Sequence, residues 1–360
     1  MAPFTLIALV LLGLIGLQHW DLNEYAITPG DATPVAPLVH VKGVSTDKHH
    51  DQILLTDVFL TRVTAWNWLL YQFQGHVQFL TPDQLLSPGV PSDELDAQGY
   101  LEMSDSKQAA EVAAFRALGW KIAAQPTGAV VNEVMAPSPA RRAHLHVGDE
   151  IVSVNRQVIQ NSCSFISAVH DLAPASTLDL GVRHVHISAS GVLSWGSVAR
   201  VSLTTVAAPK GFVSTGCSNL SGPTRSWLGL AIEDGVHYAL PASVSIDTSN
   251  IGGPSAGLAM TLTLVDRLSA GSLTGGHVVA ATGTISVNGV VGDVGGVAEK
   301  TIAVQRAGAR YFIVPQVEVA TARANASPGL SVIGVKTLAQ ALKDLRTLGG
   351  SSPTALTRPS

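Results

Sequence analysis

Charge and cysteine are both scarce in this chain of 360 residues. Asp, Glu, Lys and Arg together make up only 13% of it, and the formal net charge is −4. Because the sequence carries no basic stripe, we do not expect a nucleic acid partner. The two cysteines, Cys163 and Cys217, are too few for a disulfide framework and are not spaced as a zinc site. They form either one bridge or two separate buried thiols.

Two kinds of functional motif are also missing from the sequence. No G-x-x-x-x-G-K-[ST] pattern occurs, so the chain has no P-loop for a nucleotide. The 12 histidines are scattered. Their close groups, His49-His50 and His184 with His186, are expected at the surface or in strands rather than around a metal. We therefore expect no cofactor and no metal. The chain does have many apolar residues, 46% of the total, and enough length for two or three domains.

The first residues form a long aliphatic run, PFTLIALVLLGLIGL, which Trp20 follows where an interfacial aromatic would sit. No small-x-small cleavage site comes after it. The run predicts an uncleaved signal anchor over residues 1–20, a single pass through the cell membrane with the bulk of the chain extracytoplasmic. A cleaved signal peptide is the alternative. No Lys or Arg precedes Lys42, so the positive-inside rule gives no orientation.

The middle of the chain shows the pattern of short strands. A strand over 128–134 is followed by a Ser138-Pro139-Ala140 turn, a second strand over 147–155 and a helix over 164–172. In this order the segment resembles a bacterial-type PDZ domain. The resemblance implies a groove in which an extended polypeptide is added as an extra strand at the sheet edge. The alternative is a module that only packs against its neighbour. The carboxylate-binding loop of the groove cannot be placed from the sequence.

The last third of the chain contains a serine that could act as a nucleophile. In Gly252-Gly253-Pro254-Ser255-Ala256-Gly257, the glycines and the proline predict a tight turn that opens a helix and exposes Ser255. A serine hydroxyl needs a base, and a lysine can serve if burial favours its neutral amine. Lys300 follows Glu299 after a bend at Gly295-Gly296. Each motif alone is more typical of an ordinary helix start or a solvated lysine.

Together these motifs resemble the proteolytic domain of the Lon family. The likeness rests on Gly253 to Gly257, on Thr282-Gly283 before an Asn288-Gly289 hairpin, and on Gly295 to Lys300. It implies that Ser255 is the nucleophile and Lys300 the general base, with Thr282 holding the lysine amine in place. Backbone groups of the turn, at Gly253, Pro254 and Ala256, are expected around the oxyanion. The family also makes a homo-oligomer plausible.

The whole pattern predicts an α+β multidomain protein with an N-terminal transmembrane anchor, a PDZ-like β-rich domain and a Lon-type α+β proteolytic domain. It looks like the ATP-independent, membrane-anchored PDZ–Lon-type proteins of Gram-positive bacteria, and an actinobacterial origin is expected. The expected boundaries are 1–20 for the anchor, 21–121 for an N-terminal extracytoplasmic region, 122–206 for the PDZ domain, 207–225 for a linker, 226–347 for the proteolytic domain and 348–360 for a flexible tail. In the N-terminal region, Ser104 or Ser106 is expected to cap a helix that ends at Gly119.

The function that follows is an ATP-independent serine endopeptidase with a Ser255–Lys300 dyad. Because no ATPase motor is present, its polypeptide substrates are expected to be unfolded or flexible extracytoplasmic segments, recruited through the PDZ groove. Two alternatives stay open. One is a PDZ scaffold that binds peptides while its dyad is idle, and the other is an esterase or amidase for small acyl substrates.

Overall fold

The fold is given by a computed structural model, which describes residues 12–47, 52–170, 172–188, 191–212, 217, 220, 224–249 and 251–357. The chain divides into two compact units, each assembled from separate stretches of sequence. The first unit contains the described residues up to Pro37, together with Asp47–Leu85 and Ser255–Thr354. The second unit contains Leu38–Thr46, Leu86–Pro254 and the described residues after Thr354.

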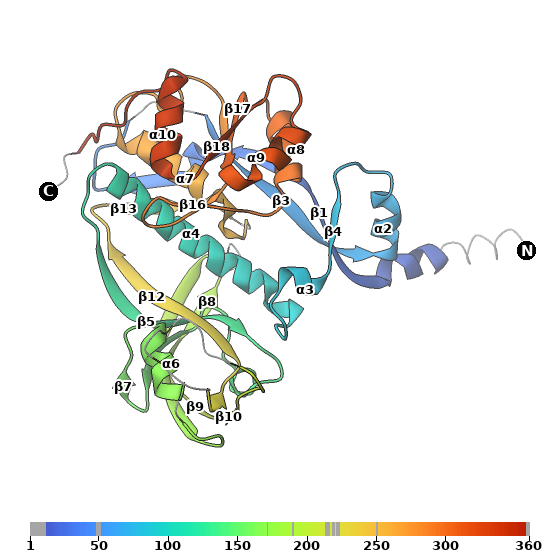
Figure 1. Cartoon of the computed structure of the whole chain (residues 1–360), viewed down its shortest axis with the longest axis vertical. Helices are drawn as coiled ribbons and strands as arrows, with labels where there is room; N and C mark the ends of the chain where they lie inside the picture. The colour runs from blue at the N-terminus through green and yellow to red at the C-terminus, as the bar shows by residue number, and fades with distance from the viewer. Residues whose placement is uncertain are drawn as a thin grey trace, which may run out of the picture. The chain divides into compact units, whose positions relative to one another are not determined.

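The first unit is built on a six-stranded sheet with the order β18-β17-β14-β3-β1-β4 (Figure 1). Its strands are β1 (Asp21–Pro34), β3 (Ile53–Thr64), β4 (Gln78–Leu80), β14 (Val279–Ala281), β17 (Tyr311–Pro315) and β18 (Ser331–Val335). Strands β3, β14, β17 and β18 run parallel, and β1 is antiparallel to both β3 and β4. At the centre of the sheet, Ala280 pairs with Leu54 on one side and Phe312 on the other.

Helices and a hairpin complete the first unit. They are α2 (Ala65–Tyr71), α3 (Pro82–Leu85), α7 (Gly257–Leu268), the hairpin of β15 (Thr284–Ile285) and β16 (Val291–Gly292), α8 (Val297–Arg306), η4 (Gln316–Glu318), α9 (Val319–Asn325) and α10 (Leu338–Thr347). Every residue of α7 except Arg267 is buried, including the polar Thr261, Thr263 and Asp266. Helices α7 and α8 both pack on β3. A core cluster joins Leu54, Phe312 and Val304 of β3, β17 and α8.

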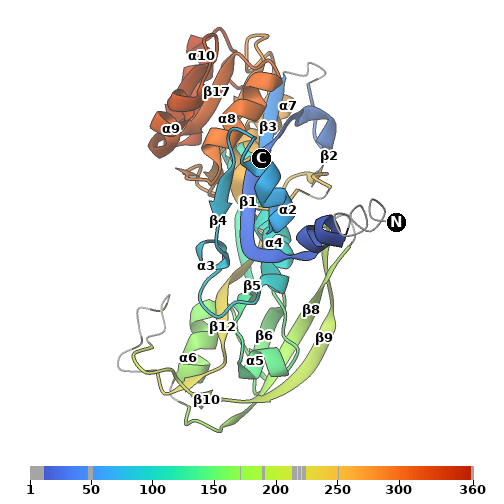
Figure 2. The same ribbon diagram turned by 90° about the vertical axis from the view of Figure 1, so that its right-hand side faces the viewer.

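The second unit contains a sheet with the order β12-β5-β6-β8-β9, and β7 pairs with β6 (Figure 2). Its elements are β2 (Val39–Lys42), η2 (Ser92–Glu94), α4 (Leu95–Ala117), β5 (Ala123–Val134), α5 (Pro139–Arg142), β6 (Glu150–Val154), β7 (Gln157–Val158), α6 (Ser162–His170), β8 (Thr177–Ile187), β9 (Leu193–Thr204), β10 (Val206–Ala207), β11 (Ser226–Trp227), β12 (Leu230–Ala239) and β13 (Ser243–Ile246). The short 3-10 helix η1 (Ala36–Leu38) begins in the first unit and ends at the first residue of the second. The core lies between this sheet and α6, with Phe165, Ile151 and Leu180 among its buried residues. Cys163 of α6 forms a disulfide with Cys217, so the pair is one bridge rather than two thiols.

The expected boundaries differ from these units at two places. The region 21–121 is not a separate layer, because β1, β3 and β4 belong to the same sheet as β14, β17 and β18. The strand β12 was expected in the proteolytic domain but pairs with β5 along its length, from Leu230 with Val134 to Ala239 with Ala123. Pairing between strands that are far apart in the sequence has no local signature, which explains both differences.

Other expectations need smaller corrections. Helix α4 ends where Gly119 predicted, but it begins at Leu95, so neither Ser104 nor Ser106 is its cap. The tail after residue 347 is partly docked on the first unit: the Ser351 N–H donates to the Ser272 carbonyl, at 2.7 Å. Residues 358–360 lie outside the described part, as do residues 213–216, 218, 219 and 221–223 of the expected linker 207–225. His184 and His186 lie in strand β8, as expected.

The expected anchor is only partly covered by the structure. Residues 1–11 lie outside the described residues, and residues 12–19 are helical. Among the described residues, no helix combines the length and the apolar character needed to cross a membrane.

Candidate active site

Ser255 lies in the turn that its sequence predicts. Gly253 has a φ of 82°, a left-handed conformation that suits glycine. Pro254 then begins a short 3-10 helix, η3 (Pro254–Ala256), which leads directly into α7. The Ser255 residue is only half-buried, whereas Ala256 is buried. The turn therefore places a serine with some solvent access at the start of a helix that is otherwise part of the core.

The backbone of Ser255 is fixed by the end of strand β14. The Ser255 carbonyl accepts a hydrogen bond from the Thr282 hydroxyl, at 3.2 Å, and another from the Gly283 N–H, at 2.9 Å. The Gly283 carbonyl in turn accepts from the Leu258 N–H of α7, at 3.0 Å. These bonds tie the serine turn, the strand end and the helix start together. These hydrogen bonds require the Ser255 turn and Thr282 to lie side by side in the same domain.

Lys300 lies in the first turn of α8, after the predicted glycine bend. Gly296 has a φ of 67°, and a Cβ at this position would lie only 2.9 Å from Val58 Cγ1, so a glycine is required there. The Lys300 residue is 2% exposed. Burial is the main cause that lowers the pKa of its amine from 10.5 to about 8. About a tenth of the amine is then neutral at pH 7, and it can accept a proton.

Three carboxylates oppose this effect. The charges of Asp57, Glu318 and Glu299 raise the pKa of Lys300, although by less than burial lowers it. Asp57 belongs to β3, and its Oδ1 accepts a hydrogen bond from the Asp31 N–H, at 2.7 Å. Burial also raises the pKa of Asp57 itself. Asp57 could not be found from the sequence, because a lone acidic residue does not indicate a neighbour more than two hundred positions away.

The structure brings Ser255 and Thr282 into contact and buries Lys300 in the same unit. Between the side chains of Ser255 and Lys300, which are both described, no hydrogen bond is formed. Catalytic hydrogen bonds are often long in the absence of substrate, so this geometry agrees with either a resting or an idle dyad. The hydroxyl of Thr282 is used by the Ser255 carbonyl, and its expected contact with the lysine amine stays a prediction.

The backbone groups expected to bind the oxyanion differ in whether an N–H is available to donate. Pro254 has no N–H, and the Gly253 N–H donates to the carbonyl of Gly99 in α4, at 2.8 Å, so neither is free to bind an oxyanion in this conformation. Ser255 is the second residue of η3, so its N–H precedes the first i to i−3 bond of that helix and lacks an intrahelical acceptor. This N–H was not among the groups predicted, and the role of the Ala256 N–H stays a prediction.

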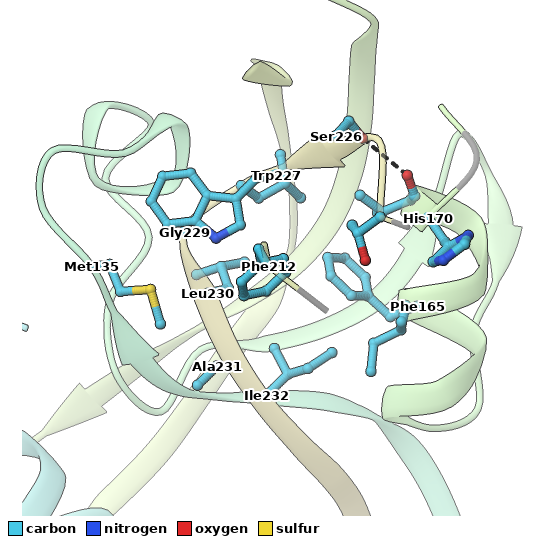
Figure 3. A pocket seen from close by; sticks show the side chains of 14 residues that line it. Met135, Phe165, His170, Phe212, Ser226, Trp227, Gly229, Leu230, Ala231 and Ile232 are labelled. Carbon is cyan, nitrogen blue, oxygen red and sulfur yellow. Dashed lines mark hydrogen bonds between the residues drawn. The ribbon is translucent and has the colours of Figure 1, made fainter. Parts of the chain in front are cut away.

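A second site, a cavity of about 230 Å³, lies in the second unit between α6 and the start of β12 (Figure 3). Phe165, Ile166 and Val169 of α6 line one side, and the segment from Trp227 to Ile232 lines the other. Among the described strands, β12 has a partner on one side only. The cavity therefore adjoins a sheet edge that can accept an extended peptide as an extra strand.

The loop before β12 was missed by the sequence analysis. Gly229 has a φ of 79°, and a Cβ there would lie 2.2 Å from the Ser138 Cβ. The carbonyls of Leu228 and Gly229 accept hydrogen bonds from Ala140 and Met135, at 3.0 and 2.9 Å. The sequence does contain a Trp-Leu-Gly-Leu segment directly before a strand. Because this segment follows residue 225, it was assigned to the expected proteolytic domain and not to the PDZ domain.

Comparisons with known proteins match two segments of the chain. Residues 234–346 match the family described as the Lon protease (S16) C-terminal proteolytic domain, and residues 102–188 match the PDZ domain family. The chain is 44% identical over 80 residues to Lon protease 1 of Herpetosiphon aurantiacus. The matched segment covers 22% of this chain and 10% of the relative. It is 34% identical over 110 residues to Lon protease 2 of Bacillus subtilis. This matched segment covers 31% of this chain and 18% of the relative.

A solved structure also resembles part of the chain. The PDZ domain of the SdrC-like protein from Listeria monocytogenes covers 29% of this chain and 87% of its own, at 19% identity and a TM-score of 0.22. The chain spans between a tenth and a fifth of the length of the two Lon proteases that it matches. From the family matches, the chain contains a PDZ domain and a Lon-type serine peptidase domain that includes Ser255, Thr282 and Lys300.

Proposed function

We propose that this chain is an ATP-independent serine endopeptidase in which Ser255 is the nucleophile and Lys300 the general base. The observation that carries the proposal is the pairing of a half-buried serine at a helix start with a lysine whose pKa burial lowers to about 8, within a Lon-type proteolytic domain. The sequence supports ATP independence because it has no P-loop.

The reaction follows from these two side chains. Ser255 Oγ attacks the carbonyl carbon of a peptide bond while its proton moves to Lys300 Nζ. The carbonyl oxygen becomes an oxyanion, which the N–H groups of Ser255 and Ala256 stabilise with the help of the helix dipole. The C–N bond then breaks, and the lysine returns its proton to the leaving amine. Lys300 next takes a proton from water as the water oxygen attacks the acyl carbon, and it returns that proton to Ser255 Oγ as the ester C–O bond breaks.

The PDZ groove recruits the substrate chain in this proposal. An extended segment pairs with the free edge of β12 and places an apolar side chain in the cavity lined by Phe165, Val169 and Ile232. Because such pairing needs an extended backbone, the substrates are unfolded or flexible segments. A scaffold with an idle dyad is the second candidate, because the groove is well formed while no hydrogen bond links the two dyad side chains, both of which are described.

The protein is anchored in the cell membrane in the same proposal, with its bulk on the extracytoplasmic side. The disulfide supports an oxidising compartment. Leu12 and Ile15 of the N-terminal helix are 64% and 51% exposed, and the nearby helix α2 has no buried residue. The Ala65 N–H at the start of α2 donates to the Trp20 carbonyl, at 2.9 Å, so these apolar surfaces adjoin each other. An aromatic, uncharged surface of this kind suits the membrane interface.

The proposed activity is tested by incubating the full chain with unfolded casein in the absence of ATP. Wild-type protein is expected to cleave casein, and Ser255→Ala and Lys300→Met are expected to lose the activity. The matched controls Ser331→Ala and Lys343→Met alter exposed residues of the same unit and should keep it. Cleavage by Ser255→Ala would refute the dyad. Casein left intact by an enzyme that hydrolyses small esters would favour the esterase alternative.

A further inference from the structure

The nucleophile turn is held from the N-terminal side by helix α4 of the second unit. The Gly253 N–H donates to the Gly99 carbonyl, at 2.8 Å, and the Ser106 hydroxyl donates to the Pro254 carbonyl, at 3.0 Å. Both bonds lie within the second unit, whose central stretch of sequence ends at Pro254. The next residue is Ser255. Helix α4 therefore fixes the backbone up to the peptide bond that carries the nucleophile.

The hydrogen bond of Ser106 is unusual for a serine inside a helix. Such a hydroxyl commonly bonds the carbonyl four positions earlier in its own helix. Ser106 instead reaches a residue 148 positions away in the sequence, and it is only 4% exposed. A buried hydroxyl without a partner is costly, so the bond to Pro254 also stabilises the packing of the turn.

The turn and the helix approach each other closely at two glycines. A Cβ on Gly252 would lie 3.2 Å from the backbone carbon of Gly99, whereas a Cβ on Gly99 would meet its nearest atom, the Gly253 nitrogen, at 3.7 Å. A side chain at Gly252 would therefore be closer to the α4 backbone than most Cβ contacts are, whereas a Cβ at Gly99 would make an ordinary van der Waals contact. The backbone of the turn thus rests directly on the backbone of α4.

The position of the Pro254 carbonyl matters because of peptide geometry. The Pro254 carbonyl and the Ser255 N–H belong to one planar unit, in which the two groups of a trans peptide point in opposite directions. A hydrogen bond to the carbonyl therefore fixes the direction of the N–H. It also polarises the peptide and makes the N–H a better donor.

We propose that Ser106 is a positioning residue for catalysis, because it orients and polarises the Ser255 N–H that faces the oxyanion. The proposal rests on the proposed peptidase activity and adds a residue outside the Lon-type domain match, from the segment that matches the PDZ family. Since the oxyanion exists only after attack, loss of this orientation lowers kcat and leaves KM nearly unchanged.

The test uses two isosteric variants of the full chain, Ser106→Thr and Ser106→Val. They have the same shape, and only the threonine keeps the hydroxyl. With a fluorogenic casein-derived peptide, we expect kcat of Ser106→Val to fall by about tenfold or more, and KM to stay within about twofold of the wild-type value. Complete removal of one oxyanion donor lowers kcat by a larger factor, and this variant only loosens the donor. Ser106→Thr should recover most of the loss. Ser104→Ala, on the same helix, is the control and should retain the wild-type rate.

A second readout separates orientation from a merely structural effect. A peptide boronate forms a tetrahedral adduct with a serine nucleophile, so its affinity should fall by about the same factor as kcat in Ser106→Val. The affinity for an unreactive peptide of the same sequence should stay unchanged. Equal kcat values for the threonine and valine variants would overturn the proposal, as would a loss of affinity for both peptides. Retained cleavage in Ser255→Ala would instead overturn the proposed function itself.

Discussion

At the scale of single residues, the proposed dyad depends on one buried lysine. Lys300 has lost nearly all contact with solvent, and the cost of burying a charge lowers its pKa to about 8 despite three nearby carboxylates. The same amine on a solvated helix would be almost fully protonated at neutral pH and useless as a base. The sequence predicted the need for burial, but only the packing of α8 against β1 and β3 provides it.

The first prediction concerns the pH dependence of turnover. The base must be neutral, and the neutral fraction of Lys300 rises as the pH rises through its pKa. We therefore expect kcat to increase with pH, with a midpoint near 8 and a plateau above it. A series of casein-cleavage rates at fixed ionic strength measures this. Activity that stayed constant down to about pH 5 would exclude a lysine base.

A second prediction concerns Asp57. Its negative charge favours the protonated amine of Lys300, so Asp57→Asn should lower the lysine pKa further. The midpoint of the pH–rate profile should then move to lower pH, by up to about one unit. Asp83→Asn, an exposed aspartate of α3, is the matched control and should leave the midpoint in place. A shift to higher pH in Asp57→Asn would contradict this electrostatic account.

At the scale of secondary-structure elements, local signals were reliable and distant pairings were not. The helix start at Pro254, the hairpin at Asn288-Gly289 and the bend at Gly295-Gly296 were all predicted, because capping and turn residues act on their immediate neighbours. Strands β1 and β3 were not recognised, and the pairing of β12 with β5 was not foreseen. Their positions depend on partners elsewhere in the chain, such as the parallel pairing of Leu54 with Ala280.

The third prediction concerns the disulfide on helix α6. Cys163 and Cys217 are 54 positions apart, and closing a loop of that length lowers the entropy of the unfolded chain. The loss of the bond is expected to destabilise the second unit by about 2–4 kcal/mol. Hydrogen exchange of the α6 and β12 amides, measured at increasing urea concentration, reports the unfolding free energy of this unit by itself. Reduced wild type and the double variant Cys163→Ser/Cys217→Ser should agree, and an unchanged midpoint in both would show that the bridge contributes nothing.

At the scale of the whole molecule, the order of the chain is not the order of the units. The first unit takes strands from both ends of the sequence, and the second unit is formed largely by the stretch between them. The motifs predicted a peptidase domain and a PDZ domain but could not show that the N-terminal strands complete the peptidase sheet. Nor could they show that Ser255 directly follows the last residue of that intervening stretch.

The central claim is that Lys300 activates Ser255, and covalent labelling tests it most directly. The full chain is treated with a fluorophosphonate at pH 8, and the modified peptide is identified by mass spectrometry. We predict a single adduct on Ser255 in the wild type, and a labelling rate lower by about a hundredfold or more in Lys300→Met, the range typical of a lost general base. Lys343→Met should label at the wild-type rate. An adduct on a different serine, or undiminished labelling of Ser255 in Lys300→Met, would contradict the dyad.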